Sequence, residues 1–523
     1  MNINRRVFLG TSSAVALGVG LAACGSEDSE TAAESTSSST TLEQPDPVAW
    51  EDLRDLAIPP EASYEQVGKV RTFNLVAQVG EAEIVPGMIT AGTYGFNGPI
   101  LGPTLRLRRG EEAAFHIENT LPEVTAVHWH GVKLPALMDG GPHTPIESGA
   151  AWDVHYTVDQ PAATCWYHPH PHGMTGVQAY RGLAGLLLID DEVSEQLDIP
   201  KEYAVDDIPL ALTDVKLTDD GQLDTTVDET VGLLGPNVAV NGVHGVRFQA
   251  QTRRVRFRIL DASTMRFHNI GFADGRSFHV IATDSGFLTQ PYEATSVAIG
   301  PGERIEIVVD LEPEEEVMLR SLGFVDNLGV PDDDYSPDFL LRNVDDLVLL
   351  RGPADDAPAV VALPSGLDPA AATVPSSNGL TERDFELNTF EINNQMMDMA
   401  RVDVTIDHDA PEIWEVTNGN SDWIHNFHIH NARFQVLEVS NTDVEFWHEG
   451  WKDTVMLPPS STARLLVEFG YHPDPHYPYM YHCHMLYHED EGMMGQYVIV
   501  EPGQKADLDT IYLQEHGEAG HGH

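Results

Sequence analysis

The sequence predicts an all-β protein of about three domains. Short runs rich in β-branched and aromatic residues alternate with turns of Gly, Pro, Asp and Asn, and no long amphipathic helix stands between them. Closely spaced short strands of this kind are typical of β-sandwiches and barrels. The chain has 523 residues, of which 42% are hydrophobic, so at roughly 150 residues per domain it can bury a core in each of about three domains.

Ten runs are the clearest strand candidates. They are residues 71–79, 104–107, 112–118, 185–189, 254–259, 304–309, 413–416, 434–439, 463–469 and 495–500. These runs fall into three blocks, 48–192, 200–355 and 375–503, which are separated by an acidic stretch and by a stretch rich in Ala, Pro and Asp. Blocks one and three share a layout, a His-x-His strand followed by a second His-rich turn, which suggests a degenerate internal repeat.

Residues 1–23 have the form of an export signal. Arg5 and Arg6 precede a short apolar run, Ala14 to Ala23, a pattern that resembles a twin-arginine signal and is too short for a membrane-spanning helix. Cys24 ends a sequence similar to a bacterial lipobox; the alternative is an ordinary signal peptide with an incidental Cys. We therefore expect export by the twin-arginine route and an extracytoplasmic protein, held at the cell surface or in the periplasm by a lipid on Cys24.

The segments next to the folded part differ from it in composition. Residues 24–47 are rich in Ser, Thr and Glu and predict a flexible tether. Residues 504–523 form an acidic tail that contains several histidines. Neither segment is expected to add to the core.

The charge balance excludes several classes of partner. The chain has 82 Asp and Glu against 29 Lys and Arg, a net charge of −53, whereas nucleic acids and anionic lipids are bound through Lys and Arg. We therefore expect no nucleic-acid partner and no membrane contact other than the lipid anchor. The acidity has two explanations that the sequence leaves open: adaptation to a saline medium, or a surface that attracts cations.

Histidines in four clusters carry the clearest chemical information. The clusters are residues 128–130, 166–170, 425–430 and 482–488, each with at least one His-x-His pair. On a strand, residues i and i+2 face the same way, so each pair presents two imidazoles side by side. Four pairs supply more nitrogens than one metal ion can use. In the fourth cluster, Cys483 points away from His482 and His484 and is expected to serve a different metal ion.

The surroundings of Cys483 predict a blue-copper site. Cys483, His488 and Met493, together with one further His, form a His₂Cys set with a weak axial Met, which is the ligand set of blue-copper electron-transfer sites. His425 is the best candidate for the second His. Cys165, in contrast, is expected to be a small buried core residue.

In this order, the four clusters resemble the four copper motifs of multicopper oxidases over about residues 60–503. The similarity is greatest to three-domain bacterial laccases and copper-efflux (cuprous) oxidases, and it includes the segments 139–142, 450–454 and 488–494. The resemblance implies an all-β fold of three cupredoxin-like Greek-key β-sandwich domains. It places the type 1 copper in the third domain, 375–503.

The resemblance also implies four copper ions and twelve ligands. The implied ligands are His425, Cys483, His488 and axial Met493 for type 1 copper, His128 and His428 for type 2 copper, and His130, His168, His170, His430, His482 and His484 for the type 3 pair. Asn426 and Asn431 depart from the family, which usually has Pro and commonly Gly at these positions. Neither position is an implied copper ligand, so the two departures are expected to change the shape of the loop and not the number of copper ions bound.

The implied reaction couples one-electron oxidation of a substrate to four-electron reduction of O₂ to water. Cys483 receives the electrons, and its neighbours His482 and His484 pass them to the type 3 pair. Asp139 and Glu489 match positions with proton-delivery roles in the family. The alternative for both carboxylates is to orient imidazoles through hydrogen bonds.

The substrate is less constrained by the sequence. A methionine-rich insertion expected of cuprous oxidases is missing, and Met396, Met397 and Met399 form the only Met cluster in this part of the third block. We expect phenols and aromatic amines to donate electrons near an exposed edge of His488 or His425, with Cu⁺ as a further substrate. A dedicated cuprous oxidase is the alternative. A non-enzymatic copper-binding or division-associated scaffold is a remote one, because such relatives lose copper ligands. A monomer is favoured.

Overall fold

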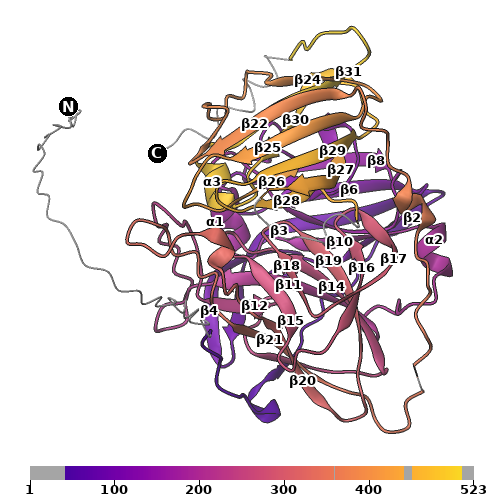
Figure 1. Cartoon of the computed structure of the whole chain (residues 1–523), viewed down its shortest axis with the longest axis vertical. Helices are drawn as coiled ribbons and strands as arrows, with labels where there is room; N and C mark the ends of the chain where they lie inside the picture. The colour runs from indigo at the N-terminus through magenta and orange to yellow at the C-terminus, as the bar shows by residue number, and fades with distance from the viewer. Residues whose placement is uncertain (1–41, 359, 441–449, 509–523) are drawn as a thin grey trace, which may run out of the picture. The chain divides into compact units, whose positions relative to one another are not determined.

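The computed structural model describes residues 42–358, 360–440 and 450–508. The predicted export signal, most of the tether including Cys24, and the tail beyond residue 508 lie outside these residues. Within them, six β-sheets form three pairs along the chain (Figure 1). No helix among the described residues is both long enough and apolar enough to cross a membrane.

The first sheet pair contains most strands up to residue 190. One sheet has the order β2-β3-β6-β8 with β4 on β3, and the other has the order β5-β10-β9-β7. The strands are β2 (Glu65–Val67), β3 (Val70–Val85), β4 (Met88–Phe96), β5 (Leu105–Arg108), β6 (Glu112–Asn119), β7 (Val127–His130), β8 (Ala151–Thr157), β9 (Ala163–Pro169) and β10 (Gly185–Asp190). Alternate residues of β6 are buried, as a sheet with one face on a core requires.

The second sheet pair has six strands in each sheet. The orders are β12-β11-β14-β19-β16-β17 and β1-β13-β21-β20-β15-β18. The strands are β1 (Arg54–Asp55), β11 (Asp207–Val215), β12 (Asn237–Val240), β13 (Val246–Gln249), β14 (Arg254–Asp261), β15 (His268–Phe272), β16 (Phe278–Thr283), β17 (Gly286–Ala294), β18 (Ser296–Ile299), β19 (Arg304–Asp310), β20 (Glu316–Ser321) and β21 (Asp345–Arg351). The early strand β1 belongs here because it pairs in parallel with β13.

The third sheet pair has the orders β23-β22-β25-β29-β27 and β24-β31-β30-β26-β28. The strands are β22 (Thr381–Asn388), β23 (Glu391–Ile392), β24 (Val404–Asp407), β25 (Glu412–Asn418), β26 (His425–Ile429), β27 (Ala432–Val439), β28 (Thr454–Leu457), β29 (Thr462–Phe469), β30 (Asp474–His482) and β31 (Met494–Val500). Trp414 and Tyr497 are fully buried in its core.

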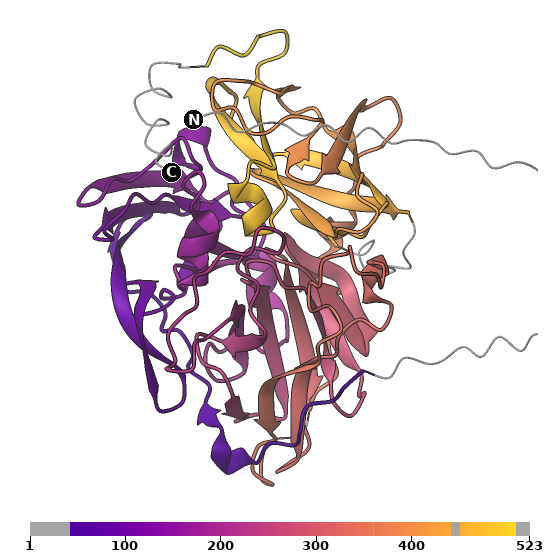
Figure 2. The ribbon, with the colours of Figure 1, turned by 90° about the vertical axis from the view of Figure 1, so that its left-hand side faces the viewer.

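The expected all-β class is confirmed. Each of the ten predicted runs overlaps a strand, and the α-helices among the described residues are single short turns: α1 (Thr175–Tyr180), α2 (Glu192–Gln196) and α3 (Leu486–Asp490). Four 3₁₀ turns complete the described elements: Trp50–Asp52, Ala136–Met138, Asn327–Gly329 and Pro369–Ala372. The helix α1 packs against α3, so the first and third sheet pairs meet there (Figure 2).

Strand register places the histidine clusters opposite one another. In the first sheet pair, His128 of β7 lies opposite His168 of β9. In the third, His428 of β26 lies opposite His482 of β30 on one side and Thr454 of β28 on the other. Clusters that are far apart in the chain thereby lie at the ends of neighbouring strands, β7 with β9 and β26 with β30.

Candidate metal centre

Cys483, His425 and His488 converge in the third sheet pair. The Nδ1 atoms of His425 and His488 are 3.1 Å apart, and Cys483 Sγ lies 3.7 and 3.6 Å from them. All three side chains, and Met493, are fully buried. Backbone hydrogen bonds from Met493 N to His488 O and from Cys483 N to Met493 O close the loop that carries these residues.

The hydrogen bonds around these residues leave a place for a cation. His425 Nε2 lies 2.9 Å from Asn420 Oδ1, and as a donor there it turns the lone pair of Nδ1 toward His488 and Cys483. Burial raises the pKa of the Cys483 thiol to about 12, so the thiol keeps its proton in the metal-free chain, and a metal ion bound here would displace that proton. A His₂Cys set fits copper, and Met493, buried and hydrogen-bonded through its backbone to His488 and Cys483, is the predicted weak ligand.

The other eight predicted histidines form one buried cluster between the first and third sheet pairs. Rings from the two pairs stack on each other: His128 on His430 with centroids 3.7 Å apart, and His130 on His428 with centroids 3.8 Å apart. All eight are at most 1% exposed; they are His128, His130, His168, His170, His428, His430, His482 and His484. Only the pair His128 and His130 lies wholly within a strand, since the other pairs extend past the strand end.

Hydrogen bonds hold the outer Nδ1 atom of five of these eight rings. The Nδ1 atoms that face an oxygen acceptor are those of His128 (Asp139 O, 3.0 Å), His168 (Pro169 O, 2.8 Å), His428 (Asp453 O, 2.8 Å), His430 (Asp139 Oδ2, 2.7 Å) and His482 (Cys483 O, 3.0 Å). Donation at Nδ1 fixes the tautomer and leaves the lone pair on Nε2.

These lone pairs point at one another. His482 Nε2 lies 3.1 Å from His430 Nε2 and 3.4 Å from His170 Nε2. The further buried ring nitrogens without a hydrogen-bond partner include Nε2 of His128, His168, His428 and His484, and Nδ1 of His130. Such a set of converging neutral imidazoles fits a group of metal ions, as the sequence predicted.

The two predicted relay carboxylates contact this cluster from outside. Glu489 Oε1 lies 3.3 Å from His170 Nδ1, and its Oε2 lies 3.2 Å from His482 Nδ1. Burial, with a smaller contribution from the neighbouring Asp490, raises the pKa of Glu489 well above its usual range. Burial likewise raises the pKa of Asp139 well above its usual range. Both groups therefore favour the protonated form in the metal-free chain.

Two contacts of the cluster were missed by sequence analysis. Asp453 Oδ1 lies 3.1 Å from His130 Nε2, and the guanidinium of Arg304 binds both oxygens of Asp453. Asp453 lies in the segment 450–454, which resembles the family, but the sequence alone did not indicate a function for its carboxylate. A charged Lys-Asp pair directly before the strand-forming run Thr454–Leu457 was the signal that could have found it.

The two departures from the family have structural explanations. Asn426 Oδ1 accepts a hydrogen bond from His484 N at 2.6 Å, and its Nδ2 donates to Pro301 O at 2.8 Å. Asn426 thus ties the loop after Cys483 to the second sheet pair. Asn431 has a φ of 49°, a left-handed conformation that Gly and Asn adopt most readily.

The expectation of an exposed His edge was wrong. His488 and His425 are both 0% exposed. The half-buried ring of Trp423 stacks on His488 with a centroid distance of 5.3 Å, and Phe390 meets the same imidazole edge-on at 5.6 Å. Trp423 lies just before β26, and Phe390 lies in the turn after β22. These two short segments cover the site without any long insertion.

The Met cluster adds to this cover. Met397 N donates a hydrogen bond to Gly492 O at 3.0 Å, next to Met493 in the chain. Met396 packs against the same glycine, and its side chain is half exposed. This segment therefore lies beside the predicted type 1 site.

The comparisons with known proteins agree with this geometry. Three family models described as multicopper oxidase match residues 78–194, 222–321 and 369–503. Cell division protein FtsP of Xenorhabdus nematophila is 34% identical over 418 residues (78% of this chain, 85% of the relative), and multicopper oxidase mco of Staphylococcus aureus is 32% identical over 429 residues (82% and 88%). The chain belongs to the multicopper oxidase family.

A solved structure supports the same assignment. A laccase from Pediococcus acidilactici superimposes with a TM-score of 0.75 at 32% identity, covering 86% of this chain and 94% of that chain. As a member of the multicopper oxidase family, the chain is an oxidoreductase, and the family implies copper in the clusters described above.

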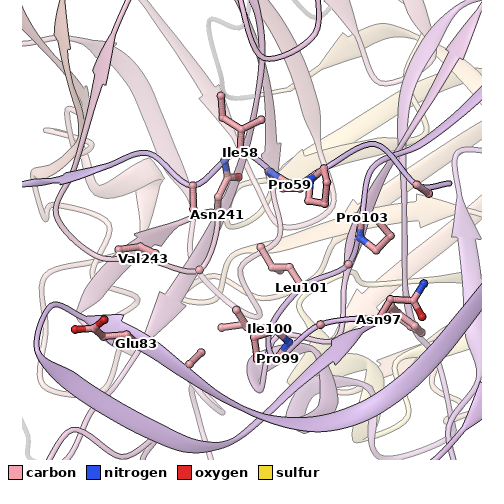
Figure 3. A pocket seen from close by; sticks show the side chains of 18 of the residues that line it. Ile58, Pro59, Glu83, Asn97, Pro99, Ile100, Leu101, Pro103, Asn241 and Val243 are labelled. Atoms are coloured by element: carbon pink, nitrogen blue, oxygen red, sulfur yellow. The ribbon is translucent and has the colours of Figure 1, made fainter.

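A separate cavity of about 880 Å³ lies between the first and second sheet pairs (Figure 3). Its lining includes Pro99, Ile100 and Leu101 of the first pair and Asn241 and Val243 of the second. None of the predicted ligands or relay residues lines it, so we assign it no part in the oxidase site.

The metal-free chain is predicted to lose stability on acidification. Burial lowers the pKa of all ten predicted His ligands, to about 3 for His168, His425 and His428 and about 4 for His482. Below a pH of about 6.5, the unfolded chain binds protons that the folded chain cannot, so stability falls as the pH falls. The raised pKa values of Asp139 and Glu489 act in the opposite sense, but ten imidazoles outnumber them.

Thermal unfolding of the chelator-treated chain at about pH 7.5 and about pH 5.5 measures this effect. We expect a lower midpoint at the acidic pH. A midpoint that is unchanged or higher would contradict the proposed dominance of the buried imidazoles.

Proposed function

We propose that this protein is a laccase-like multicopper oxidase that oxidises phenols and aromatic amines one electron at a time and reduces O₂ to water. One observation carries the proposal: the chain holds a buried His₂Cys set and a buried cluster of eight histidines, and Cys483 of the first lies between His482 and His484 of the second. We assign type 1 copper to the first set. We assign one type 2 and two type 3 copper ions to the second.

Bound copper would supply one-electron redox chemistry at both places. Cys483 lies between His482 and His484 in the chain, so only a few covalent bonds separate the thiolate that would hold the type 1 copper from two imidazoles that would hold the type 3 pair. The strand β26 serves both sites, because His425 and His428 lie three residues apart and therefore on opposite faces. The protein's part is to hold these groups rigidly and away from water.

Glu489 and Asp139 are proposed to deliver the protons that O₂ reduction consumes. Each carboxyl contacts the outer nitrogen of a cluster imidazole and is almost fully buried. Glu489 also neighbours Asp490, whose carboxylate accepts hydrogen bonds from Thr175 N and Gly176 N at 2.8 Å at the start of α1. These contacts place the two acids where they can hold or pass a proton beside the cluster.

A second candidate function comes from the similarity to cell division protein FtsP, which is as high as the similarity to multicopper oxidase mco. A scaffold role in division would not need a complete set of copper ligands. The convergence of the ten predicted histidines and Cys483 in two buried sites, together with the burial of Met493, favours the oxidase. Oxidation of Cu⁺ is retained as a further reaction of the same site, and the acidic surface would favour approach of this cation.

The place of action is also a proposal. The twin-arginine-like segment and the lipobox-like Cys24 support export and lipid anchoring outside the cytoplasm. The net charge of −53 excludes an electrostatic hold on anionic lipid. Contact with the membrane would therefore depend on the lipid anchor.

Copper loading under anaerobic conditions tests the proposed function. The loaded chain is expected to hold about four copper ions, to be blue, and to oxidise a phenol with O₂ as acceptor, because a Cu–thiolate bond gives the type 1 colour. Cys483→Ser removes the thiolate and is expected to abolish the blue absorbance and oxidation while the histidine cluster still binds copper. Full copper loading without any oxidation of a phenol or Cu⁺ would instead favour the scaffold role.

Glu489→Gln tests the proton relay. The amide keeps the shape of the side chain but cannot carry a proton, so O₂ consumption is expected to fall by about 10²-fold. Anaerobic reduction of the blue site by a phenol should be unchanged. Glu491→Gln, an exposed neighbour, is the matched control. Unchanged O₂ consumption in Glu489→Gln would exclude the relay.

Trp423→Ala tests the aromatic cover. Removing the ring that stacks on His488 exposes the imidazole, so a bulky phenol can approach closer, and kcat/KM for it is expected to rise about threefold, or ~0.7 kcal/mol in the barrier. Trp50→Ala, at a half-buried Trp beside Arg247 and Arg351, is the control. A lower kcat/KM in Trp423→Ala would show that electrons pass through the indole instead.

A further inference from the structure

Arg304 reaches from the second sheet pair into the histidine cluster of the other two. It is the first residue of β19, and its side chain is fully buried. Nε donates to Thr164 O at 2.9 Å; Nη1 donates to Gly302 O at 2.9 Å and Asp453 Oδ1 at 2.7 Å; Nη2 donates to Asp284 O at 2.9 Å and Asp453 Oδ2 at 2.6 Å. All five N–H donors of the guanidinium are therefore used.

These partners come from all three sheet pairs. Thr164 lies in β9 of the first pair, Asp284 and Gly302 belong to the second, and Asp453 directly precedes β28 of the third. A bidentate guanidinium–carboxylate pair fixes both the position and the plane of the carboxylate. Lysine has three donors at one point and cannot reproduce this arrangement.

Asp453 in turn contacts two histidines that stack on each other. Its Oδ1 accepts a hydrogen bond from His130 Nε2 at 3.1 Å, and its backbone carbonyl accepts one from His428 Nδ1 at 2.8 Å. Donation at Nε2 leaves the lone pair of His130 on Nδ1, which is buried without a hydrogen-bond partner. His130 therefore presents Nδ1 to the cluster, because its Nε2 donates to the Asp453 carboxylate. His428 presents Nε2 instead, because its Nδ1 donates to the Asp453 backbone carbonyl.

The chain leaves room for this close approach. Gly131 follows His130 with a φ of +83°. A Cβ at Gly131 would lie 2.6 Å from Arg304 Nη2 and 3.0 Å from Asp453 Oδ2. Because five hydrogen bonds hold the guanidinium in place, it could not move aside, so the pair and the glycine form one packed unit beside His130.

We propose that Arg304 is a positioning residue for the histidine cluster. By fixing the Asp453 carboxylate, it sets the tautomer of His130 and the position of His428, so the second sheet pair, which supplies none of the twelve predicted ligands, is required to assemble the copper cluster. The inference rests on the proposed function, because it concerns copper binding by these histidines.

Arg304→Lys, with Arg266→Lys as control, tests the proposal in the full copper-loaded chain. Arg266 is also a buried arginine of the second sheet pair, with Asp345 and Gly235 O as partners, and no predicted ligand is among these partners. Copper per chain, the blue absorbance and the type 2 electron paramagnetic resonance signal are measured. Arg304→Lys is expected to keep the blue absorbance, to hold at least about one copper ion fewer per chain at the histidine cluster, and to change the type 2 signal; Arg266→Lys should match the unchanged chain.

A double variant covers a failure of Arg304→Lys to fold. Arg304→Met with Asp453→Asn removes both buried charges together, which avoids leaving one charge unpaired in the core. The same selective loss of copper from the histidine cluster, with the blue absorbance kept, is expected. Copper content and signals equal to those of the unchanged chain would overturn the proposal, and so would an equal loss of blue and type 2 signals, because that marks a general folding role. If the unchanged chain itself bound no copper, the proposed function would fail instead.

Discussion

Neutral imidazoles whose lone pairs face one another at short range are the constraint on which the rest of the structure depends. His430 and His482, whose Nδ1 atoms both face oxygen acceptors, bring their Nε2 atoms to 3.1 Å. Without protons between them, such pairs repel in a buried site, and a metal ion relieves the repulsion. The surrounding fold must therefore hold rings in place that would move apart by themselves.

The protein meets this demand with hydrogen bonds to the outer nitrogen of most of the eight rings in the cluster. Backbone carbonyls serve several of them, and carboxylates that contact others, those of Asp139, Glu489 and Asp453, are nearly or fully buried. A buried carboxylate is costly unless it is paired or protonated. Asp453 is paired with Arg304, whereas burial shifts Asp139 and Glu489 toward the protonated form. All three carboxylates contact cluster imidazoles, and the shift toward the protonated form supports the proposal that Asp139 and Glu489 also move protons.

Much of the site could be predicted from sequence because its chemistry is concentrated in local spacing. His-x-His pairs, a Cys between two histidines, and a Met five residues after His488 define ligand sets over a few residues each. The strand runs were found for the same reason, since alternation is a local pattern. The burial of His488 could not be predicted, because Trp423 and Phe390 cover its imidazole from other turns of the third sheet pair.

The sequence by itself determined the all-β class, the family resemblance and the identity of the residues that converge, because residue type and spacing limit both strand formation and metal chemistry. Only the tertiary structure decided which nitrogen each ring presents, what covers the Cys483 site, and that the second sheet pair reaches the cluster through Arg304. Those features depend on contacts between residues such as His130 and Asp453, which are more than 300 positions apart. Local patterns carry no information about such contacts, because the packing of whole sheets creates them.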